Sequence, residues 1–141
     1  METQDRLDIA EVLARQSHIV DRGELETLDA VFTADAVYDM SAAGLPVMEG
    51  VDALRAGALR LGAENPIAHH VTNVFIARDG GDEVEVDSKG LMLTGDGRMR
   101  SVTHHDLFRR TAAGWRIARR TIVPQREPLG GLLDTPAGAE Q

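Results

Sequence analysis

The chain has 141 residues, of which 43% are hydrophobic and 27% are charged. This length is typical of one domain, and the composition is that of a globular protein rather than a disordered, fibrous or membrane-spanning one. Fifteen Lys and Arg residues against 23 Asp and Glu residues give a net charge of −8. That charge repels nucleic acid and anionic membranes, so we expect neither as a partner unless basic side chains cluster.

One basic cluster does occur near the C-terminal end of the chain, formed by Arg109, Arg110, Arg116, Arg119 and Arg120. Only 4% of the residues are aromatic, and no stacking pattern is interleaved with the arginines. We therefore interpret the cluster as one solvated strand face.

The chain contains no cysteine, which removes disulfides, thiolate chemistry and cysteine-based metal sites. The N-terminal stretch METQDRLDIAEV is too charged for a signal peptide. No apolar run approaches the roughly 18 residues of a membrane span. We expect a cytoplasmic protein.

The first half of the chain has helical spacing. In residues 3–20 apolar side chains recur at steps of three and four, and Gly23 is a natural stop; the stripe consists of Leu7, Ala10, Leu13, Ala14 and Val20. Shorter helices fit residues 24–32 and 51–62, and the run DAVYDM at 35–40 predicts a short strand between them.

Four runs that are typical of strands follow Pro66, at residues 68–78, 83–94, 99–110 and 115–123. The turn signals DGGD, GDG and TAAG separate them. Helices followed by an antiparallel meander predict an α+β domain over residues 1–123, in which about three helices pack on one face of a curved antiparallel sheet. Residues 124–141 are rich in Pro and Gly and predict a loose C-terminal tail or an arm that covers a partner.

Two histidine doublets, His69–His70 and His104–His105, lie in predicted strands. Adjacent strand residues point to opposite faces, so one histidine of each pair can face the core. Periodicity leaves the choice between His69 and His70 open. In the other doublet His104 shares a face with Asp106, a spacing that allows the carboxylate to orient the imidazole. A single strand histidine is more commonly a structural or exposed residue.

An ideal helix over residues 3–21 would place Asp21 between Ala10 and Ala14, and therefore point its carboxylate inward. If the helix ended earlier, Asp21 would lie in a solvated turn. A carboxylate on an apolar face needs a partner or a raised pKa, so Asp21 is a candidate for function.

A zinc or iron site formed by His and Asp side chains is the first alternative. Adjacent strand histidines cannot reach one ion, however. If the turns centre near Gly80 and Asp96, His69 lies opposite about Met92, and Met92 opposite about Arg100 or Ser101. This register leaves the two doublets roughly 10 Å apart across the sheet. We expect no metal.

Three segments together, HIVDRGELETLDAVFTADAVYDM, HHVTNVFIARDGGDEVEV and THHDLFRRTAAGWRIARRTIV, resemble the nuclear transport factor 2-like superfamily. The resemblance is to its SnoaL-like branch, near scytalone dehydratase, bile-acid dehydratases and polyketide cyclases. It implies a cone-shaped α+β barrel with a deep apolar pocket, no obligatory cofactor, and a homodimer or homotrimer.

The dehydratases that the chain resembles have an acid near the end of the first helix, a tyrosine on the following strand and a histidine opening the strand after the third helix. Asp21, Tyr38 and His69 occupy those positions. The second histidine of scytalone dehydratase has no counterpart near residues 92–94, and His104 together with Asp106 could supply that donor. The resemblance implies that the pocket is lined by side chains that ordinary core packing would explain equally well, namely Phe32, Val71, Phe75, Met92 and Phe108.

The implied function is a cofactor-independent general acid–base enzyme, a dehydratase, isomerase or cyclase. Its substrate would be a small hydrophobic hydroxy-carbonyl compound, of polyketide or steroid-like character. The alternative is a non-catalytic ligand-binding or assembly subunit, similar to the small subunit of an oxygenase, in which the polar groups of the pocket would be uncoupled.

Overall fold

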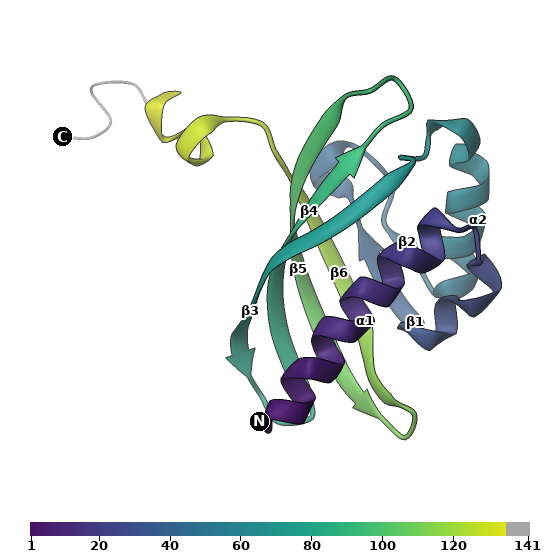
Figure 1. The fold of residues 1–141 in the computed structure, drawn as a ribbon, viewed down its shortest axis with the longest axis vertical. Coiled ribbons are helices and arrows are strands. Elements are labelled where there is room, and N and C mark those ends of the chain that lie inside the picture. The colour runs from purple at the N-terminus through teal and green to yellow at the C-terminus, as the bar shows by residue number, and fades with distance from the viewer. Residues whose placement is uncertain (135–141) are drawn as a thin grey trace.

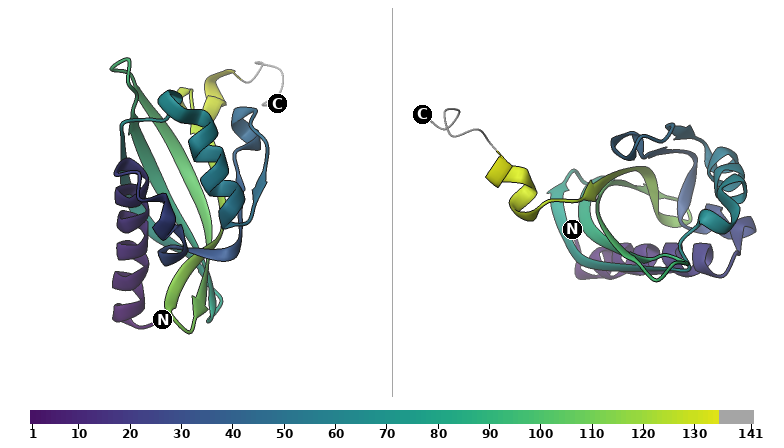
Figure 2. Two further views of the ribbon diagram at one scale, coloured as in Figure 1. Left: turned by 90° about the vertical axis from the view of Figure 1, so that its right-hand side faces the viewer. Right: turned by 90° about the horizontal axis from the view of Figure 1, so that it is seen from above.

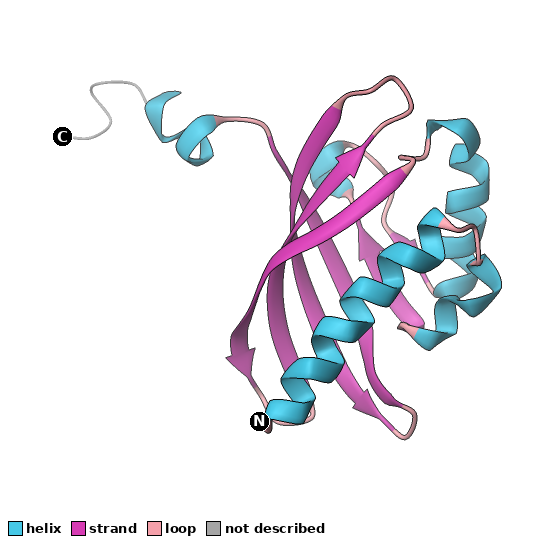
Figure 3. Cartoon of the chain, in the orientation of Figure 1, coloured by secondary structure: helices cyan, strands magenta, loops and turns pink. Residues whose placement is uncertain are grey.

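A computed structural model describes residues 1–134 of the chain (Figure 1, Figure 3). In chain order the elements are α1 (Thr3–Asp21), the 3-10 helix η1 (Leu25–Ala30), β1 (Phe32–Asp39), η2 (Ser41–Ala43), β2 (Met48–Glu49), α2 (Val51–Leu61), η3 (Gly62–Glu64), β3 (Ala68–Asp79), β4 (Glu83–Leu93), β5 (Met99–Thr111), β6 (Gly114–Gln125) and η4 (Pro128–Asp134). The predicted strands and the first and third predicted helices are present at bounds that differ by a few residues. The segment expected as a second helix is a short 3-10 helix instead.

The six strands form one sheet in the order β2-β1-β6-β5-β4-β3. Strands β3 to β6 make the predicted antiparallel meander. The prediction of an entirely antiparallel sheet is wrong at one pair, because β1 lies parallel to β6. These two strands are far apart in sequence and no hairpin joins them, so turn chemistry does not set their relative direction.

The sheet is strongly curved, and both α-helices lie on the same side of it (Figure 2). A bulge in β3 contributes to the curvature: the register shifts between Thr72 and Phe75, and Asn73 adopts φ 56°. The space between the sheet and the helices is filled by one hydrophobic core, whose members include Ile9, Leu13, Leu28, Val31, Phe32, Leu54, Val84, Val86, Phe108, Trp115 and Ile117. This arrangement confirms the predicted α+β class and the curved sheet.

Helix α1 packs through Ile9, Leu13 and Ile19, each at most 5% exposed. The predicted stripe is therefore rotated, because Leu7 is 59% exposed. The helix faces the core with a mixture of apolar and polar side chains, including buried Gln16. The spacing of the apolar residues alone therefore predicted the wrong buried face for α1.

A carboxylate fixes the N-terminal end of α1 to the sheet. Asp5 Oδ1 accepts hydrogen bonds from Trp115 Nε1 at 3.1 Å and lies 3.1 Å from Arg110 Nη1. The Arg110 guanidinium also covers the Trp115 ring at 4.4 Å from its centroid. The hydrogen bonds from Arg110 and Trp115 lower the pKa of Asp5 to about 2. Asp21 stands at the opposite end of the same helix.

The C-terminal segment leaves the body of the domain after β6, which continues two residues beyond the expected boundary at 123. Within the described part, η4 projects away from the sheet (Figure 1). Residues 135–141 of the predicted tail lie outside the described residues. Within residues 1–134 no helix combines the length and apolar character that a bilayer crossing requires.

Candidate active site

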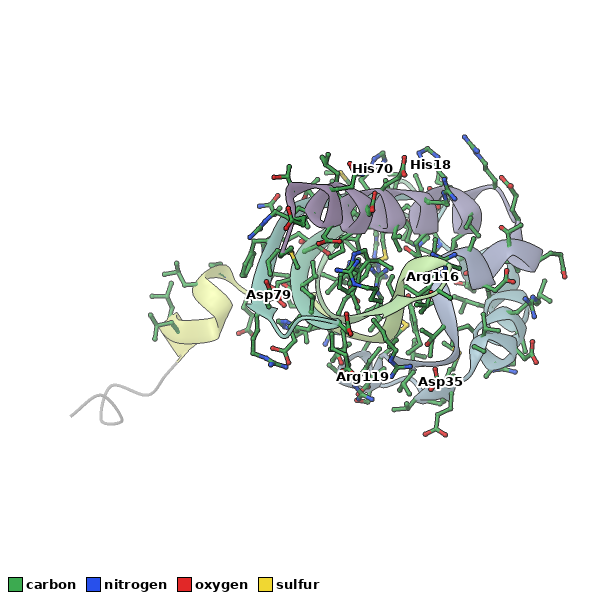
Figure 4. All side chains as sticks on the ribbon, turned by 90° about the horizontal axis from the view of Figure 1, so that it is seen from below. His18, Asp35, His70, Asp79, Arg116 and Arg119 are labelled. Atoms are coloured by element: carbon green, nitrogen blue, oxygen red, sulfur yellow. The ribbon has the colours of Figure 1, made fainter. Side chains whose placement is uncertain are left out.

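Strand pairing decides which histidine of the first doublet faces the core. His69 pairs with Met92, which confirms the register expected from the turns. Met92 lies on the face of β4 that carries buried Val84, Val86 and Ser88. His70 pairs with Leu91 and points to the other side. Figure 4 shows His70 at the outer edge of the molecule, near His18 of α1.

Asp21 is the last residue of α1 and holds His69 at two points. Its Oδ1 lies 2.6 Å from His69 Nδ1, and its Oδ2 accepts the backbone N–H of His69 at 2.9 Å. Because an ionised carboxylate can only accept, a neutral imidazole in this contact carries its proton on Nδ1 and keeps a lone pair on Nε2. The two side chains are 22% and 24% exposed. The pair is therefore oriented and still accessible.

A groove with a volume of about 400 Å³ runs between α1 and β3 and reaches His69. This volume lies within the roughly 300 to 1,000 Å³ of small-molecule sites. The groove is lined by Ala10, Leu13, Ala14, Ser17, His18, His69, His70, Val71, Thr72 and Val74. Ser17 is one of these lining residues, and its Oγ is buried without a hydrogen-bond partner within the described residues.

His104 lies deeper in the domain, at 7% exposure. Its Nδ1 is 3.3 Å from Ser88 Oγ, on the strand position opposite. The ring extends over Gly90, where an added Cβ would come within 2.8 Å of His104 Cε1. Burial, and then the positive charge of Arg120, lower the pKa of His104 to about 2. This histidine is consequently neutral and acts as a hydrogen-bonding group.

The predicted His104–Asp106 pair is wrong, because Asp106 is taken by another partner. Arg120 donates to both oxygens of Asp106, from Nε at 2.8 Å and from Nη2 at 2.9 Å. Its Nη1 donates to Gln16 Oε1 at 3.1 Å. Arg120 and Asp106 are 1% and 3% exposed, so they form a buried ion pair of the bidentate kind.

Sequence reasoning missed Arg120, since it placed the whole arginine cluster on a solvated face. Arg119 is exposed and lies at the periphery (Figure 4), whereas Arg120 points inward. A strict alternation from Trp115 and Ile117 would turn Arg119 inward. The register of β5 and β6 shifts between Leu107 and Phe108, and this irregularity reverses the alternation.

Tyr38 lies beside Arg120, its partner in the parallel β1–β6 pairing. It packs against the core, with its ring edge-on to Phe32 at a centroid distance of 6.2 Å. Burial raises the pKa of the Tyr38 hydroxyl, and the charge and hydrogen bond of Arg120 oppose that rise. The tyrosine is therefore protonated at neutral pH and available as a donor.

The predicted pocket-lining residues separate into four groups. Phe32 and Phe108 are core residues at 2% and 0% exposure, and Val71 lines the groove. Met92 is partly buried opposite His69. The placement of Phe75 in the pocket is wrong: the β3 bulge pairs it with Asp87 on the outer face, where it is 57% exposed.

The core-facing side of the sheet thus carries a diagonal of polar groups. Asp21 and His69 are hydrogen-bonded at one end; at the other end Arg120 is hydrogen-bonded to Asp106 and is the register partner of Tyr38. His104 lies between the two groups, since the charges of both Arg120 and His69 contribute to lowering its pKa. Within residues 1–134, no three His, Asp or Glu side chains gather closely enough to hold a metal ion.

Comparisons with known proteins agree with this fold. Residues 1–121 match the model of the SnoaL-like domain. The uncharacterized protein Rv2910c of Mycobacterium tuberculosis is 30% identical over 129 residues, which cover 84% of each chain.

Solved structures share the fold. A structure from Novosphingobium aromaticivorans, assigned provisionally as an aromatic ring hydroxylase, is 29% identical with a TM-score of 0.74, and the match covers 90% of this chain and 93% of that one. A second protein from the same organism, assigned provisionally as a scytalone dehydratase, is 20% identical with a TM-score of 0.72 over 89% of each chain, which shows the fold alone. The chain therefore belongs to the SnoaL-like domain family of the nuclear transport factor 2-like superfamily.

Proposed function

We propose that the protein is a cofactor-independent general acid–base enzyme of the dehydratase, isomerase or cyclase type. The observation that carries this proposal is the Asp21–His69 pair at the end of the α1–β3 groove. Asp21 is hydrogen-bonded to both the ring and the backbone N–H of His69, and these two contacts fix the tautomer and the orientation of the imidazole. A positioned base of this kind is what proton abstraction from carbon requires.

In the proposed reaction, His69 Nε2 takes the proton from the carbon next to a carbonyl group. The electron pair of that C–H bond forms a carbon–carbon double bond. In a dehydration, the hydroxyl group on the next carbon leaves as water and takes a proton from the imidazolium or from Tyr38. In an isomerisation, the proton returns to a different carbon. The Asp21 carboxylate stabilises the imidazolium between the two steps.

The groove favours a small, largely apolar substrate with a few oxygen atoms. Leu13, Val71 and Val74 supply apolar surface along its length, and a hydroxy-carbonyl compound would bring its reacting carbon to His69. Neutral His104 and Tyr38 lie further along the diagonal and offer donors for an oxygen that gains negative charge. We place this activity in the cytoplasm, and in a homodimer or homotrimer that sedimentation would test.

The histidine doublet provides a matched pair of variants for the test. Hydroxy-carbonyl compounds, including polyketide-like and steroid-like ones, are incubated with the protein, and the change in ultraviolet absorbance on forming a conjugated double bond is followed. His69→Gln should lower turnover by about 10²- to 10⁴-fold, whereas His70→Gln should lower it far less, because His70 also lines the groove but points to the side of β3 away from Asp21.

The binding or assembly subunit is the competing outcome. The 29% identical neighbour assigned provisionally as an aromatic ring hydroxylase keeps that class open. Equal and small effects of His69→Gln and His70→Gln on ligand affinity, with no turnover of any compound, would favour it. A larger loss in His70→Gln would contradict the acid–base assignment of His69 directly.

A further inference from the structure

Two buried serines differ in their hydrogen bonding. Ser88 on β4 is 1% exposed, and its Oγ lies 3.3 Å from His104 Nδ1. Ser17 on α1 is 7% exposed, and its Oγ has no hydrogen-bond partner within the described residues. A serine inside a helix can bond to the carbonyl group four residues earlier, but Ser17 does not make that bond. Since a buried polar group without a partner destabilises a fold, the Ser17 hydroxyl is a candidate for ligand binding.

Helix α1 is held in a way that prevents it from turning this hydroxyl toward water. The neighbouring Gln16 accepts a hydrogen bond at Oε1 from Nη1 of the buried Arg120, at 3.1 Å. One turn later, Asp21 is bonded to His69. Rotation of the helix about its axis would break both contacts. The unpaired hydroxyl of Ser17 is therefore a fixed feature of the folded domain.

Ser17 lines the groove between α1 and β3, as His69 does. Ser17 and Asp21 are four residues apart on α1, so their side chains lie on one face of the helix, about 6 Å apart along its axis. Asp21 holds His69, so the serine lies one helical turn from the group that orients the proposed base. Rotation about χ1 between staggered positions can turn the hydroxyl to a ligand without moving the helix. Neither His104 nor Tyr38 is among the side chains that line this groove.

We propose that the Ser17 hydroxyl donates a hydrogen bond to the carbonyl oxygen of the substrate. This inference rests on the proposed function. When His69 takes a proton from the carbon next to the carbonyl group, negative charge develops on the carbonyl oxygen, and a donor aimed at that oxygen stabilises the charge. The serine keeps its own proton, and the proton from carbon resides on His69 Nε2. Because the Ser17 hydroxyl has no partner in the free protein, no protein hydrogen bond is broken when the substrate binds.

The direction of the groove also sets the orientation of the substrate. Strand β3 runs antiparallel to α1, since the last residue of α1 meets the second residue of β3, while the amino group of Met1 lies 3.2 Å from Asp79. The end of the groove away from the proposed base is formed mainly by apolar side chains, among them Ala10, Leu13 and Val74. Seven residues of helix separate Ser17 from Ala10, a distance of about 10 Å. The substrate would therefore carry its carbonyl group at one end and an apolar body along the groove.

Two small probes measure this contact without turnover. Acetophenone and ethylbenzene share an apolar body and differ in one carbonyl oxygen, and the binding of each can be followed through the ¹⁵N amide signals of Val71 and Thr72. Ser17→Ala should weaken the binding of acetophenone by about 2- to 10-fold, as expected for one hydrogen bond, and leave that of ethylbenzene unchanged. Ser101→Ala is the control, since Ser101 pairs with Leu91 and does not line the groove. Equal effects on both probes, or a wild-type protein without preference for acetophenone, would overturn the inference.

Stability separates a ligand-binding serine from a structural one. Ser17→Ala removes a hydroxyl without a partner, so the midpoint of urea unfolding should stay constant or rise. Ser88→Ala removes the hydrogen-bond partner of His104 Nδ1, so its midpoint should fall. A fall of the same size in Ser17→Ala would show that the Ser17 hydroxyl stabilises the fold, and would contradict the inference.

Kinetics on a hydroxy-carbonyl substrate test the role of the same hydroxyl in the reaction. Ser17→Ala should lower kcat by about 10²-fold, as expected for the loss of one donor to a developing oxyanion. An unchanged kcat would contradict the inference. If Ser17→Ala weakens acetophenone binding selectively in a protein that turns over no hydroxy-carbonyl compound, the proposed function is wrong and the contact of Ser17 with a carbonyl oxygen remains.

Discussion

Two His–Asp pairs lie on opposite faces of the same sheet. On the core-facing side, His69 Nδ1 meets Asp21 Oδ1 at 2.6 Å, and the pair joins residues 48 positions apart. On the outer side, His105 Nδ1 meets Asp87 Oδ1 at 2.9 Å, between register partners of β4 and β5. The distances alone do not distinguish the pairs.

Their surroundings do distinguish them. The Asp21 carboxylate also accepts the backbone N–H of His69, and His69 lines the groove, whereas the His105 side chain is 50% exposed on an open sheet surface. Water can replace every contact of the outer pair. A His–Asp contact therefore indicates a candidate site only where a second restraint and a cavity accompany it.

Removing the carboxylate charge from each pair in turn should produce the largest difference between them. Asp21→Asn should lower turnover of a hydroxy-carbonyl substrate by about 10²- to 10⁴-fold, because an amide supports neither the tautomer nor the imidazolium of His69. Asp87→Asn should leave turnover near wild type. Steady-state kinetics on both variants decide the point, and comparable losses would mean that the two pairs are equivalent.

The next largest effect concerns the support of the core-facing side. Gly90→Ala should destabilise the fold by about 1–3 kcal/mol, because the new methyl group would force the His104 ring to move. Gly95→Ala is the control, since nothing lies within 4 Å of a Cβ at that position. Urea unfolding of both variants provides the measurement. Equal stability of the two variants would show that His104 does not depend on the space over Gly90.

The stability of the fold should depend on pH through His104 of the second doublet. The pKa of His104 is about 2 in the folded protein and near 6.5 when the chain is unfolded. The unfolded state therefore binds an additional proton below pH 6.5, and stability falls there by about 1.4 kcal/mol per pH unit. Between pH 6.5 and 5 the loss should amount to about 2 kcal/mol. Above pH 6.5 His104 is neutral in both the folded and the unfolded state, so its effect on the free energy of unfolding no longer changes with pH.

Denaturant unfolding between pH 5 and 8 provides the measurement. His104→Gln should remove this part of the slope, although it also lowers stability at every pH. His105→Gln should keep the slope, because that side chain is half exposed. A wild-type slope that survives His104→Gln would assign the pH dependence to other groups.

The smallest effect belongs to the outer pair itself. A double-mutant cycle with His105→Gln and Asp87→Asn should give a coupling energy of about 0.2–1 kcal/mol, which salt screens. The same cycle on His69 and Asp21 should give a larger value that salt changes less. Thermal unfolding at low and high salt separates the two, and an outer pair with the stronger coupling would reverse the comparison.

The sequence predicted those parts of the fold and site that follow from regular periods. Hairpin turns at residues 80 and 96 placed His69 opposite Met92. The pairing of Asp21 with His69 followed from the family resemblance, because the helix periodicity predicted a buried face of α1 that is exposed at Leu7. The errors share one physical cause. Bulges near Asn73 and Leu107 reverse the alternation, and they exposed Phe75 and buried Arg120.

Other parts of the site depend on competition between partners. Asp106 is two residues from His104, a spacing that allows pairing, but the forked guanidinium of Arg120 from β6 takes both of its oxygens. Such a choice depends on tertiary contacts between distant segments. Neither the composition nor the periodicity of the sequence predicts which partner Asp106 takes.

Helix α1 is fixed at both ends by carboxylates that reach later parts of the chain, and this has a consequence for folding order. Asp5 meets Trp115 across 110 positions, and Asp21 meets His69 across 48. Contacts of such separation form only as the chain closes large loops, which makes them slow relative to helix formation. In a refolding experiment, activity would report docking at one end of α1, and fluorescence of the single tryptophan would report docking at the other.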